Sequence, residues 1–288
     1  MSKEYDGKDL VPGKDGLPVR EVGAWSKQKH YYLKRYIDIF TQGMKRKWPG
    51  LGYLDIFCGP GKCKIRSSDE EIDGSPLIAA NTGRSFDSFV FADMSIDAID
   101  TLEKRFKPKK QDAEVAYFSG NDSNDIADKI VAKMPTNFLH LAFLDPTGLH
   151  LDFNTVRKIT RARNVDLIIS VMDRVDMLRN ISAYYYPNQD RNSNLDKFLG
   201  DGIDWRTAYD RLHNQDATHV GEMFLELYQQ QLKGIGYSHF GDLKRVYMNG
   251  VSPLYLLFFA SKHALGVDFW NKISAKDFTG QRSFYFSD

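Results

Sequence analysis

The chain has 288 residues and a formal net charge of +1, and 42% of its residues are hydrophobic. This allows a sizeable core, and because bulk charge favours no particular partner, any nucleic-acid binding must rest on local basic patches. Two cysteines, Cys58 and Cys63, are too few for a disulfide framework or a four-ligand zinc site, so no metal is expected and a reducing cytoplasm fits best. With no apolar signal region and no apolar run long enough to span a bilayer, membrane association is not expected.

Residues 1–24 hold six glycines and prolines among charged residues, so an extended or flexible arm is expected before a domain over 25–288. Ser26 is a suitable N-cap for a helix that ends at Pro49-Gly50. One side of this helix carries an apolar stripe at helical spacing. The other is basic, and two interpretations stay open: a solvated helix face or a surface that binds nucleic-acid phosphates. The basic residues are Lys27, Lys29, Lys34, Arg35, Lys45, Arg46 and Lys47.

The segment 52–61, GYLDIFCGPG, predicts a short buried strand followed by a sharp turn. Gly59 and Gly61 lack Cβ atoms, so the backbone can turn tightly and approach a ligand, although an ordinary turn is the alternative. Nucleotide-like ligands bind at the carboxyl ends of strands in open α/β sheets. The polar stretch 62–74 is interpreted as a lid over the ligand or as a plain surface insertion. Ser75-Pro76 then predicts the start of a helix, with Ser75 as N-cap.

Two further strands end in polar residues. A strand over 88–92 ends at Asp93, where a carboxylate can accept hydrogen bonds from both hydroxyls of a ribose. A helix is predicted over 97–106 and a third strand over 115–118. The residues that follow, 120–124, are small and polar. They could bind an adenine amino group or merely cap the next helix.

The segment 139–144 is the strongest strand signal, and its apolar residues predict burial on both faces. It runs into Asp145-Pro146-Thr147-Gly148, and burying an acid there is costly unless it meets a ligand or partner. After a helix over 152–161, the segment 165–171 predicts a fifth strand. Five alternations of strand and helix predict a doubly wound, mostly parallel sheet.

The alternation stops over 173–217, a mixed aromatic and charged insertion. It is interpreted either as a substrate-recognition element or as a small helical cap. A helix over 220–232, strands over 240–248 and 255–260, and a helix over 267–273 follow. Two adjacent strands at this point predict an antiparallel hairpin at one edge of the sheet.

Taken in order, these pieces resemble a class I S-adenosylmethionine-dependent methyltransferase, and DIFCGPG resembles the first motif of that fold. More specifically, most of 22–275 resembles the three-Cys-motif partner (TcmP) family. Two positions depart from the family pattern: Cys58 replaces a small residue such as alanine and is expected to be packed rather than reactive, and Thr147 replaces an aromatic residue. The matching pieces are VGAWSKQKHYYLKRY, GYLDIFCGPG, IDGSPLIAAN, GNDSN, FLDPTGL, VDLIIS with Arg179, and YLLFFASKH.

The resemblance implies a Rossmann-like α/β domain: a mostly parallel seven-stranded sheet, an antiparallel edge hairpin and a cap inserted after the fifth strand. It also implies S-adenosylmethionine as cofactor, S-adenosylhomocysteine as product, and an iron–sulfur-type three-Cys-motif partner protein. The D-P-x-G tip is similar to that of enzymes that methylate a guanine amino group in tRNA. Three functions stay open: a methyltransferase acting on nucleic acid, one acting on a protein or small molecule, and a catalytically idle module that binds cofactor or partner.

For methyl transfer to a nitrogen or oxygen acceptor, each candidate residue has an expected role. Asp145 accepts a proton or hydrogen bond from the acceptor, and Pro146 holds it at the strand tip. Asp93 binds the ribose. The remaining cofactor-binding candidates are Asp55, Gly59 and Gly61 for the methionine part, Asn121 and Asp122 for the adenine, and Phe57 and Met94. A nicotinamide dehydrogenase is disfavoured because the helix start lacks the third glycine.

Overall fold

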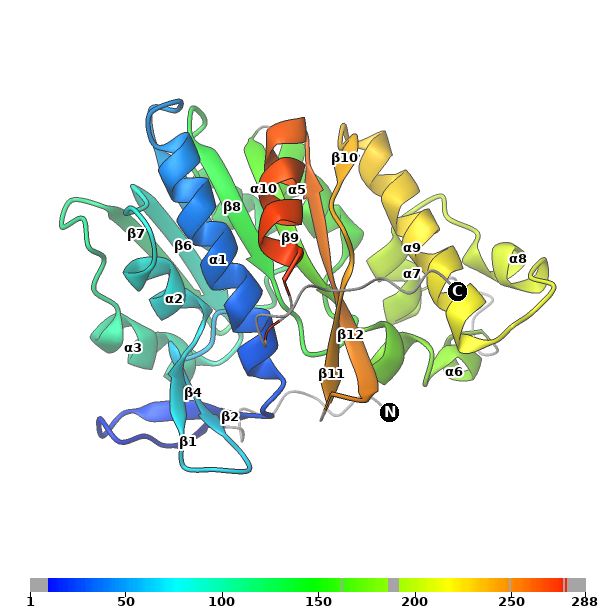
Figure 1. Ribbon diagram of the computed structural model, residues 1–288, viewed down its shortest axis with the longest axis horizontal. Coiled ribbons are helices and arrows are strands. Elements are labelled where there is room, and N and C mark those ends of the chain that lie inside the picture. Colours follow the sequence, from blue (N-terminus) through cyan, green and yellow to red (C-terminus); the bar gives the residue numbers. More distant parts are fainter. Residues whose placement is uncertain (1–9, 162, 186–191, 249, 277, 279–288) are drawn as a thin grey trace.

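The computed structural model describes residues 10–278 except 162, 186–191, 249 and 277, and its centre is one large twisted sheet (Figure 1). The strand order is β10-β12-β9-β8-β3-β6-β7, and β11 also pairs with β12. The strands are β3 (Leu51–Asp55), β6 (Ser88–Asp93), β7 (Glu114–Ser119), β8 (Leu139–Leu144), β9 (Asn164–Val171), β10 (His239–Phe240), β11 (Lys244–Met248) and β12 (Ser252–Ser261).

The predicted mostly parallel sheet with an antiparallel edge is confirmed. Strands β7, β6, β3, β8 and β9 run parallel, whereas β12 is antiparallel to β9. Both β10 and β11 pair antiparallel with the other edge of β12 and so occupy one position, which makes seven positions in all. The strand predicted over 240–248 is interrupted because Gly241 lies directly against the Trp270 ring, where a Cβ atom would come within 2.2 Å of Cδ1.

Helices cover both faces of the sheet and form two hydrophobic cores. Apolar residues of α1, α2, α3 and α10 pack on one face, and those of α4, α5 and α9 pack on the other. Figure 1 shows α1 and α10 crossing in front of the sheet. The helices are α1 (Ser26–Met44), α2 (Ser75–Asn81), α3 (Ile96–Arg105), α4 (Ala127–Ala132), α5 (Phe153–Arg161), α9 (Ala217–Gly234) and α10 (Ala264–Ser274). None of the helices among the described residues is long and apolar enough to cross a membrane.

Strand β8 shows how the two cores orient the residues beyond the strand. All six of its residues are buried. Side chains alternate along a strand, so Leu141 and Phe143 enter the core under α1 while Ala142 and Leu144 enter the core under α5. The next residue, Asp145, therefore faces α1.

A second sheet lies at the carboxyl end of the parallel strands (Figure 1). The amino-terminal arm, expected to be extended or flexible, supplies the strands β1 (Leu10–Pro12) and β2 (Pro18–Val22), and the polar stretch 62–74 contains a hairpin of β4 (Lys62–Ile65) and β5 (Glu71–Asp73). Strand β2 pairs in parallel with β4, so the two segments form one four-stranded sheet. Residues 1–9, which also belong to the predicted arm, lie outside the described residues.

The insertion after β9 is helical, which agrees with one of its two interpretations. It contains a short π-helix, η1 (Asp173–Met177), and the helices α6 (Ile181–Tyr185), α7 (Asn194–Leu199) and α8 (Trp205–Asp210). Trp205 is fully buried in the core on the α9 side, and its indole N–H donates to Asp196 over 2.7 Å. Asp196 also binds the guanidinium of Arg206, so one carboxylate ties α7 to α8.

Candidate functional site

The glycine turn after β3 is bound to the tip of β6. Gly59 and Gly61 have φ angles of +62° and +86°, which side-chain-bearing residues rarely adopt. A Cβ atom on Gly61 would also lie 2.9 Å from Leu102 Cδ1. The N–H of Gly59 donates to Asp93 Oδ2 over 2.9 Å. The structure thus brings together two of the predicted cofactor-binding positions, the turn and the acid.

Asp93 is already engaged by a residue that the sequence did not suggest. Its Oδ1 accepts from the N–H of Ser95, and the Arg20 guanidinium from β2 lies 3.1 Å from Oδ2. The same guanidinium covers Gly59, where an added Cβ atom would come within 3.3 Å of Arg20 Nη1. Arg20 therefore uses part of the hydrogen-bonding capacity of Asp93.

Asp55 closes β3 and is fully buried. Its carboxylate accepts hydrogen bonds from the Phe57 N–H and from the Tyr53 and Ser75 hydroxyls. Burial nevertheless raises the pKa of Asp55 to about 7. The N-cap of α2 is Gly74, one residue before the predicted Ser75, whose hydroxyl faces Asp55 instead. The Phe57 ring packs against the core on the α5 side.

The tips of β6 and β7 form an open surface that is partly apolar. Met94 and Ile96 are 52% and 57% exposed, and both follow Asp93 closely. Gly120 approaches Ile96, with a φ angle of +70°. The predicted Asn121 and Asp122 are exposed beside it and make only local hydrogen bonds. Exposed apolar side chains beside amide and carboxylate groups suit a flat heterocycle, and Ile96 was not among the predicted residues.

Asp145 forms an ion pair with Lys29 through Oδ2. Lys29 comes from the first turns of α1, and its Nζ also lies 5.6 Å from the centre of the Tyr255 ring. Burial opposes the charge on Lys29, but the Asp145 carboxylate raises the pKa of this lysine above its ordinary value. Asp145 Oδ1 is buried and has no hydrogen-bond partner among the described residues. Pro146 beside it is buried, while Thr147 is exposed.

Three groups beside this ion pair, His30, Cys63 and Tyr255, are neutral near pH 7. Burial and the neighbouring Lys29 lower the pKa of His30 to about 3. Burial raises the pKa of Cys63 to about 11 and that of Tyr255 to about 12. Cys58 is 5% exposed and burial also raises the pKa of its thiol, which agrees with a packed rather than reactive cysteine. Of these residues, Lys29 and His30 are part of VGAWSKQKHYYLKRY, one of the pieces that carry the family resemblance.

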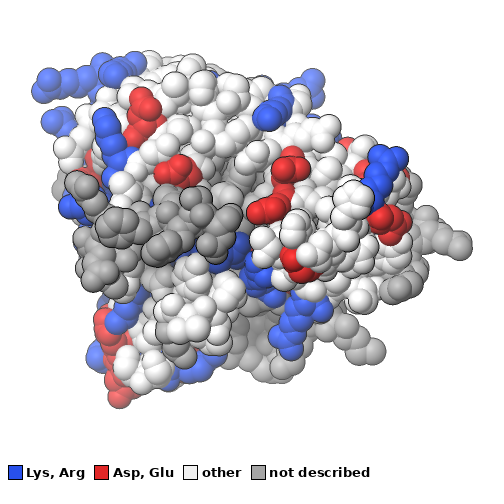
Figure 2. Space-filling model, turned by 45° about the vertical axis from the view of Figure 1, so that its right-hand side comes forward, with Lys and Arg blue, Asp and Glu red and all other residues white. Residues whose placement is uncertain are grey.

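The basic residues of α1 do not form one surface near Asp145. Lys27 pairs with Glu70, whereas Lys29 turns inward to Asp145. Lys45 binds Asp87, which also accepts from the N–H of Leu51 at the start of β3, so Lys45 lies at the opposite end of the sheet. Figure 2 shows acidic and basic side chains interspersed over the face in view, with several Lys and Arg in its lower middle.

The insertion begins against the turn that follows Asp145. The N–H of Leu149 donates to Asp176 Oδ2 over 2.9 Å, and a Cβ atom on Gly148 would collide with the same carboxylate. Asp173 at the tip of β9 is 1% exposed and pairs with Arg245 over 2.8 Å. The turn after β8 is thus joined to the start of the helical cap, and the first residue of the cap, Asp173, is joined to β11.

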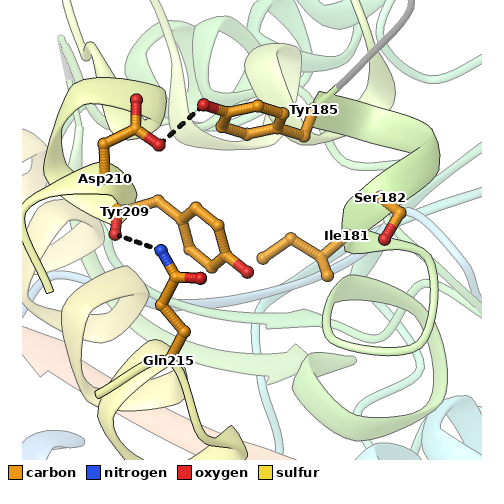
Figure 3. A pocket seen from close by; sticks show the side chains of 6 residues that line it. All are labelled: Ile181, Ser182, Tyr185, Tyr209, Asp210 and Gln215. Carbon is orange, nitrogen blue, oxygen red and sulfur yellow. Dashed lines mark hydrogen bonds between the residues drawn. The ribbon is translucent and has the colours of Figure 1, made fainter. Parts of the chain in front are cut away.

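Two hollows lie near these elements. A pocket of about 180 Å³ in the insertion lies between α6 and α8 (Figure 3). In it the Tyr185 hydroxyl donates to Asp210 over 2.6 Å, and the Gln215 amide donates to the Tyr209 carbonyl. A wider groove of about 420 Å³ lies between α1 and α2, and its lining includes Lys27, His30, Tyr31, Lys34, Ile78 and Asn81.

Comparison with solved structures finds similarity at low sequence identity. A Legionella pneumophila protein of the family model DUF519 superposes with a TM-score of 0.51 at 11% identity, covering 92% of this chain and 96% of that chain. An O-methyltransferase from Bacillus cereus in complex with SAH gives 0.45 at 10% identity over 81% and 80% of the two chains. The magnesium protoporphyrin IX methyltransferase of Synechocystis PCC 6803, with bound SAH, gives 0.40 at 10% identity over 83% and 88%. No family model and no curated protein matches the chain. The TM-score of 0.51 shows that the chain shares an α/β fold with the Legionella protein.

Proposed function

We propose that this protein is an S-adenosylmethionine-dependent methyltransferase of the three-Cys-motif partner type that methylates a nitrogen or oxygen acceptor. One observation carries the proposal. The glycine turn after β3, bound to Asp93 at the tip of β6, lies one strand away from Asp145 at the tip of β8, since β3 pairs with both β6 and β8. Ligands of open α/β sheets bind at this carboxyl edge.

The residues at these strand tips offer the cofactor several contacts. Gly59 and Gly61 allow the backbone to turn sharply at this edge, with Arg20 and Leu102 packed where their Cβ atoms would be, and exposed Met94 and Ile96 offer apolar contact to a ring. At Asp93, Arg20 would compete with the ribose hydroxyls for the carboxylate. When bound, S-adenosylmethionine supplies an activated methyl group, and its transfer leaves S-adenosylhomocysteine.

The chain's own residues then position the acceptor. Asp145 Oδ1 is free to accept a hydrogen bond from an acceptor N–H or O–H and to take up the proton that methylation releases. Pro146 is buried and restricts the backbone of Asp145 to extended geometry. Because the methyl donor is already activated, positioning can supply most of the rate enhancement.

A second candidate function is a catalytically idle module that binds S-adenosylhomocysteine or a partner protein. The specific observation in its favour is that both key carboxylates are paired within the chain, Asp93 with Arg20 and Asp145 with Lys29. A three-Cys-motif protein is the partner that the family resemblance proposes. A nucleic-acid partner remains a proposal for Lys27 and Lys34, which line the groove beside α1.

Calorimetric titration with S-adenosylhomocysteine, with NAD as the control, tests the proposal. We expect micromolar binding of the first and none of the second. Asp145→Asn should bind S-adenosylhomocysteine as the wild type does, while methyl transfer falls by about 10²-fold or more, because a positioned acid–base group contributes about that much. Absence of binding would favour the idle module, and unchanged transfer by Asp145→Asn would remove the role assigned to Asp145.

A further inference from the structure

The ion pair between Lys29 and Asp145 involves only one of the two carboxylate oxygens of Asp145. Lys29 Nζ binds Oδ2, while Oδ1 is buried and has no hydrogen-bond partner among the described residues. The two side chains are only 13% and 16% exposed. Buried polar atoms are almost always hydrogen-bonded in native proteins. A buried carboxylate oxygen without a partner at a strand tip therefore indicates that a bound molecule supplies the hydrogen-bond donor.

A purely structural role explains this pair poorly. Helix α1 is already held on the sheet by a continuous apolar stripe that includes Leu33, Ile37 and Phe40, all at most 1% exposed. Replacing a buried ion pair by packed apolar residues is often neutral or stabilising. Lys29 and Asp145 are therefore not needed to attach the helix, and a role in the site accounts better for them.

Three of the groups beside the pair are neutral, and one further carboxyl, Asp55, acts on Asp145. The titratable groups come from five places in the fold: α1 gives Lys29 and His30, the tip of β8 gives Asp145, β4 gives Cys63, β12 gives Tyr255, and β3 gives Tyr53 and Asp55. His30, Cys63 and Tyr255 are uncharged near pH 7, because burial lowers the pKa of the first and raises those of the other two. The single positive and single negative charge of the pair then cancel.

We propose that Lys29 is the positioning residue for Asp145, and that the pair selects an uncharged acceptor carrying an N–H or O–H on the atom to be methylated. By holding Oδ2, Lys29 fixes the carboxylate plane so that Oδ1 faces the acceptor. A cationic acceptor would be repelled by the ammonium of Lys29, whose charge already offsets that of Asp145, and a protonated amine has no lone pair to receive a methyl group. Amides, aromatic amines and hydroxyls meet the requirement. This inference rests on the proposed function.

The first test measures the pair itself and needs no methyl donor. Lysine side chains are followed by heteronuclear NMR during a pH titration of the full chain. In Asp145→Asn, burial of Lys29 is no longer opposed by a carboxylate, so its pKa should fall below the ordinary value of 10.5. Asp128→Asn is the matched control, since it removes the partner of Lys158 from an exposed ion pair on the other face of the sheet. An identical Lys29 titration in the wild type and Asp145→Asn would overturn the proposal.

The second test measures transfer and its product. Tritiated S-adenosylmethionine is supplied with the RNA, protein and small-molecule fractions of a cell extract, and the labelled product is hydrolysed and identified. Lys29→Met should slow transfer by about 10²-fold, as expected when a catalytic group is misplaced by about 1 Å. Lys29→Arg should recover to within about tenfold of wild type, because it restores the charge with a different geometry. Lys158→Met, which breaks the exposed pair, should transfer at the wild-type rate.

The outcomes separate this proposal from the function on which it rests. Failure of the wild type to bind S-adenosylhomocysteine removes the proposed function, whatever Lys29 does. If the wild type binds it and Lys29→Met binds it within about threefold, but also transfers at the wild-type rate, Lys29 has no positioning role and the function stands. Label found on the side-chain nitrogens of lysine or arginine would overturn the neutral-acceptor assignment alone, whereas label on an amide, aromatic amine or hydroxyl would support it.

Discussion

Asp55 shows how one buried carboxyl makes stability depend on pH. Burial raises its pKa from the ordinary 3.8 to about 7 in the folded chain. Between these values the folded protein holds a proton that the unfolded chain has released. The free energy of unfolding therefore falls as pH rises from about 4 to about 7 and is level above that.

Asp55→Asn should remove this dependence, because the amide oxygen can still accept from Phe57 and Ser75 but does not titrate. Urea unfolding of both proteins at pH 5 and pH 8 measures it. We expect the stability of the variant relative to wild type to increase by about 1 kcal/mol or more between the two pH values. A difference that stays constant with pH would contradict the assigned shift.

Replacing Arg20 tests whether its guanidinium competes with the cofactor or helps to bind it, because the two roles change the affinity in opposite directions. We expect its guanidinium to compete with the ribose hydroxyls for Asp93, so that cofactor binding includes the free-energy cost of displacing it. Arg20→Ala should therefore bind S-adenosylhomocysteine about threefold to tenfold more tightly in calorimetry. Arg66→Ala is the control, because Arg66 pairs with Glu21 of the same strand but is 62% exposed. Weaker binding by Arg20→Ala would show that the guanidinium is part of the cofactor site.

At the scale of elements, the small sheet depends on one arginine from α3. Arg105 is 6% exposed and binds Asp15, the carbonyl oxygens of Leu17 and Pro18 in the arm, and that of Pro60 in the glycine turn. Arg105→Met should weaken local closure of β1, β2 and β4 by about 1–3 kcal/mol, since hydrogen bonds to a charged group are lost. Hydrogen exchange over 10–22 and 62–73 measures it, and exposed Lys104→Met is the control. Protection equal to wild type would show that strand pairing alone holds the sheet.

The elements that can be predicted from the sequence depend on local contacts, whereas those that cannot depend on contacts between residues far apart in the sequence. Strand β8 was predicted with its observed bounds because a run buried on both faces is visible locally. The hairpin of β4 and β5 is not visible in the polar stretch 62–74, because β4 pairs with Arg20 and its neighbours, more than forty residues earlier. The prediction of Ser26 as the N-cap of α1 is wrong by one residue, since Ser26 is buried inside the first turn and Trp25 is the N-cap.

The same limit applies to the candidate site. Chemistry at a strand tip can be read from order alone, which is why Asp93 and Asp145 were named from the sequence. Their counter-ions could not be read in this way, because Arg20 and Lys29 lie 73 and 116 residues away. A basic helix face looks alike in sequence whether its lysines point to solvent or inward, and only the packing of α1 decides that Lys29 points inward.

Over the whole molecule, α1 is tied to the sheet at three levels. Lys29 binds Asp145 at the carboxyl edge, Lys45 binds Asp87 at the amino edge, and between them the Tyr36 hydroxyl donates to Asp166 of β9 over 2.8 Å. Tyr36 and its partner are both buried, so loss of the hydroxyl leaves a carboxylate oxygen without its donor. The hydrogen bond from Tyr36 to Asp166 should therefore contribute to global stability, although it lies away from the strand tips.

Tyr36→Phe should lower the free energy of unfolding by about 1–3 kcal/mol, the cost of leaving a buried polar group unsatisfied. Urea denaturation at pH 7 measures this, and S-adenosylhomocysteine binding measured alongside should not change. Tyr117→Phe is the matched control, because Tyr117 is only partly buried and packs by its ring against Phe91. If the two variants unfold at the same urea concentration, the hydroxyl of Tyr36 adds nothing and α1 is held by its apolar stripe. If Tyr36→Phe also weakens ligand binding, the middle of α1 is coupled to the carboxyl edge of the sheet. The effects of Lys29 variants would then reflect the packing of the whole helix as well as the contact with Asp145.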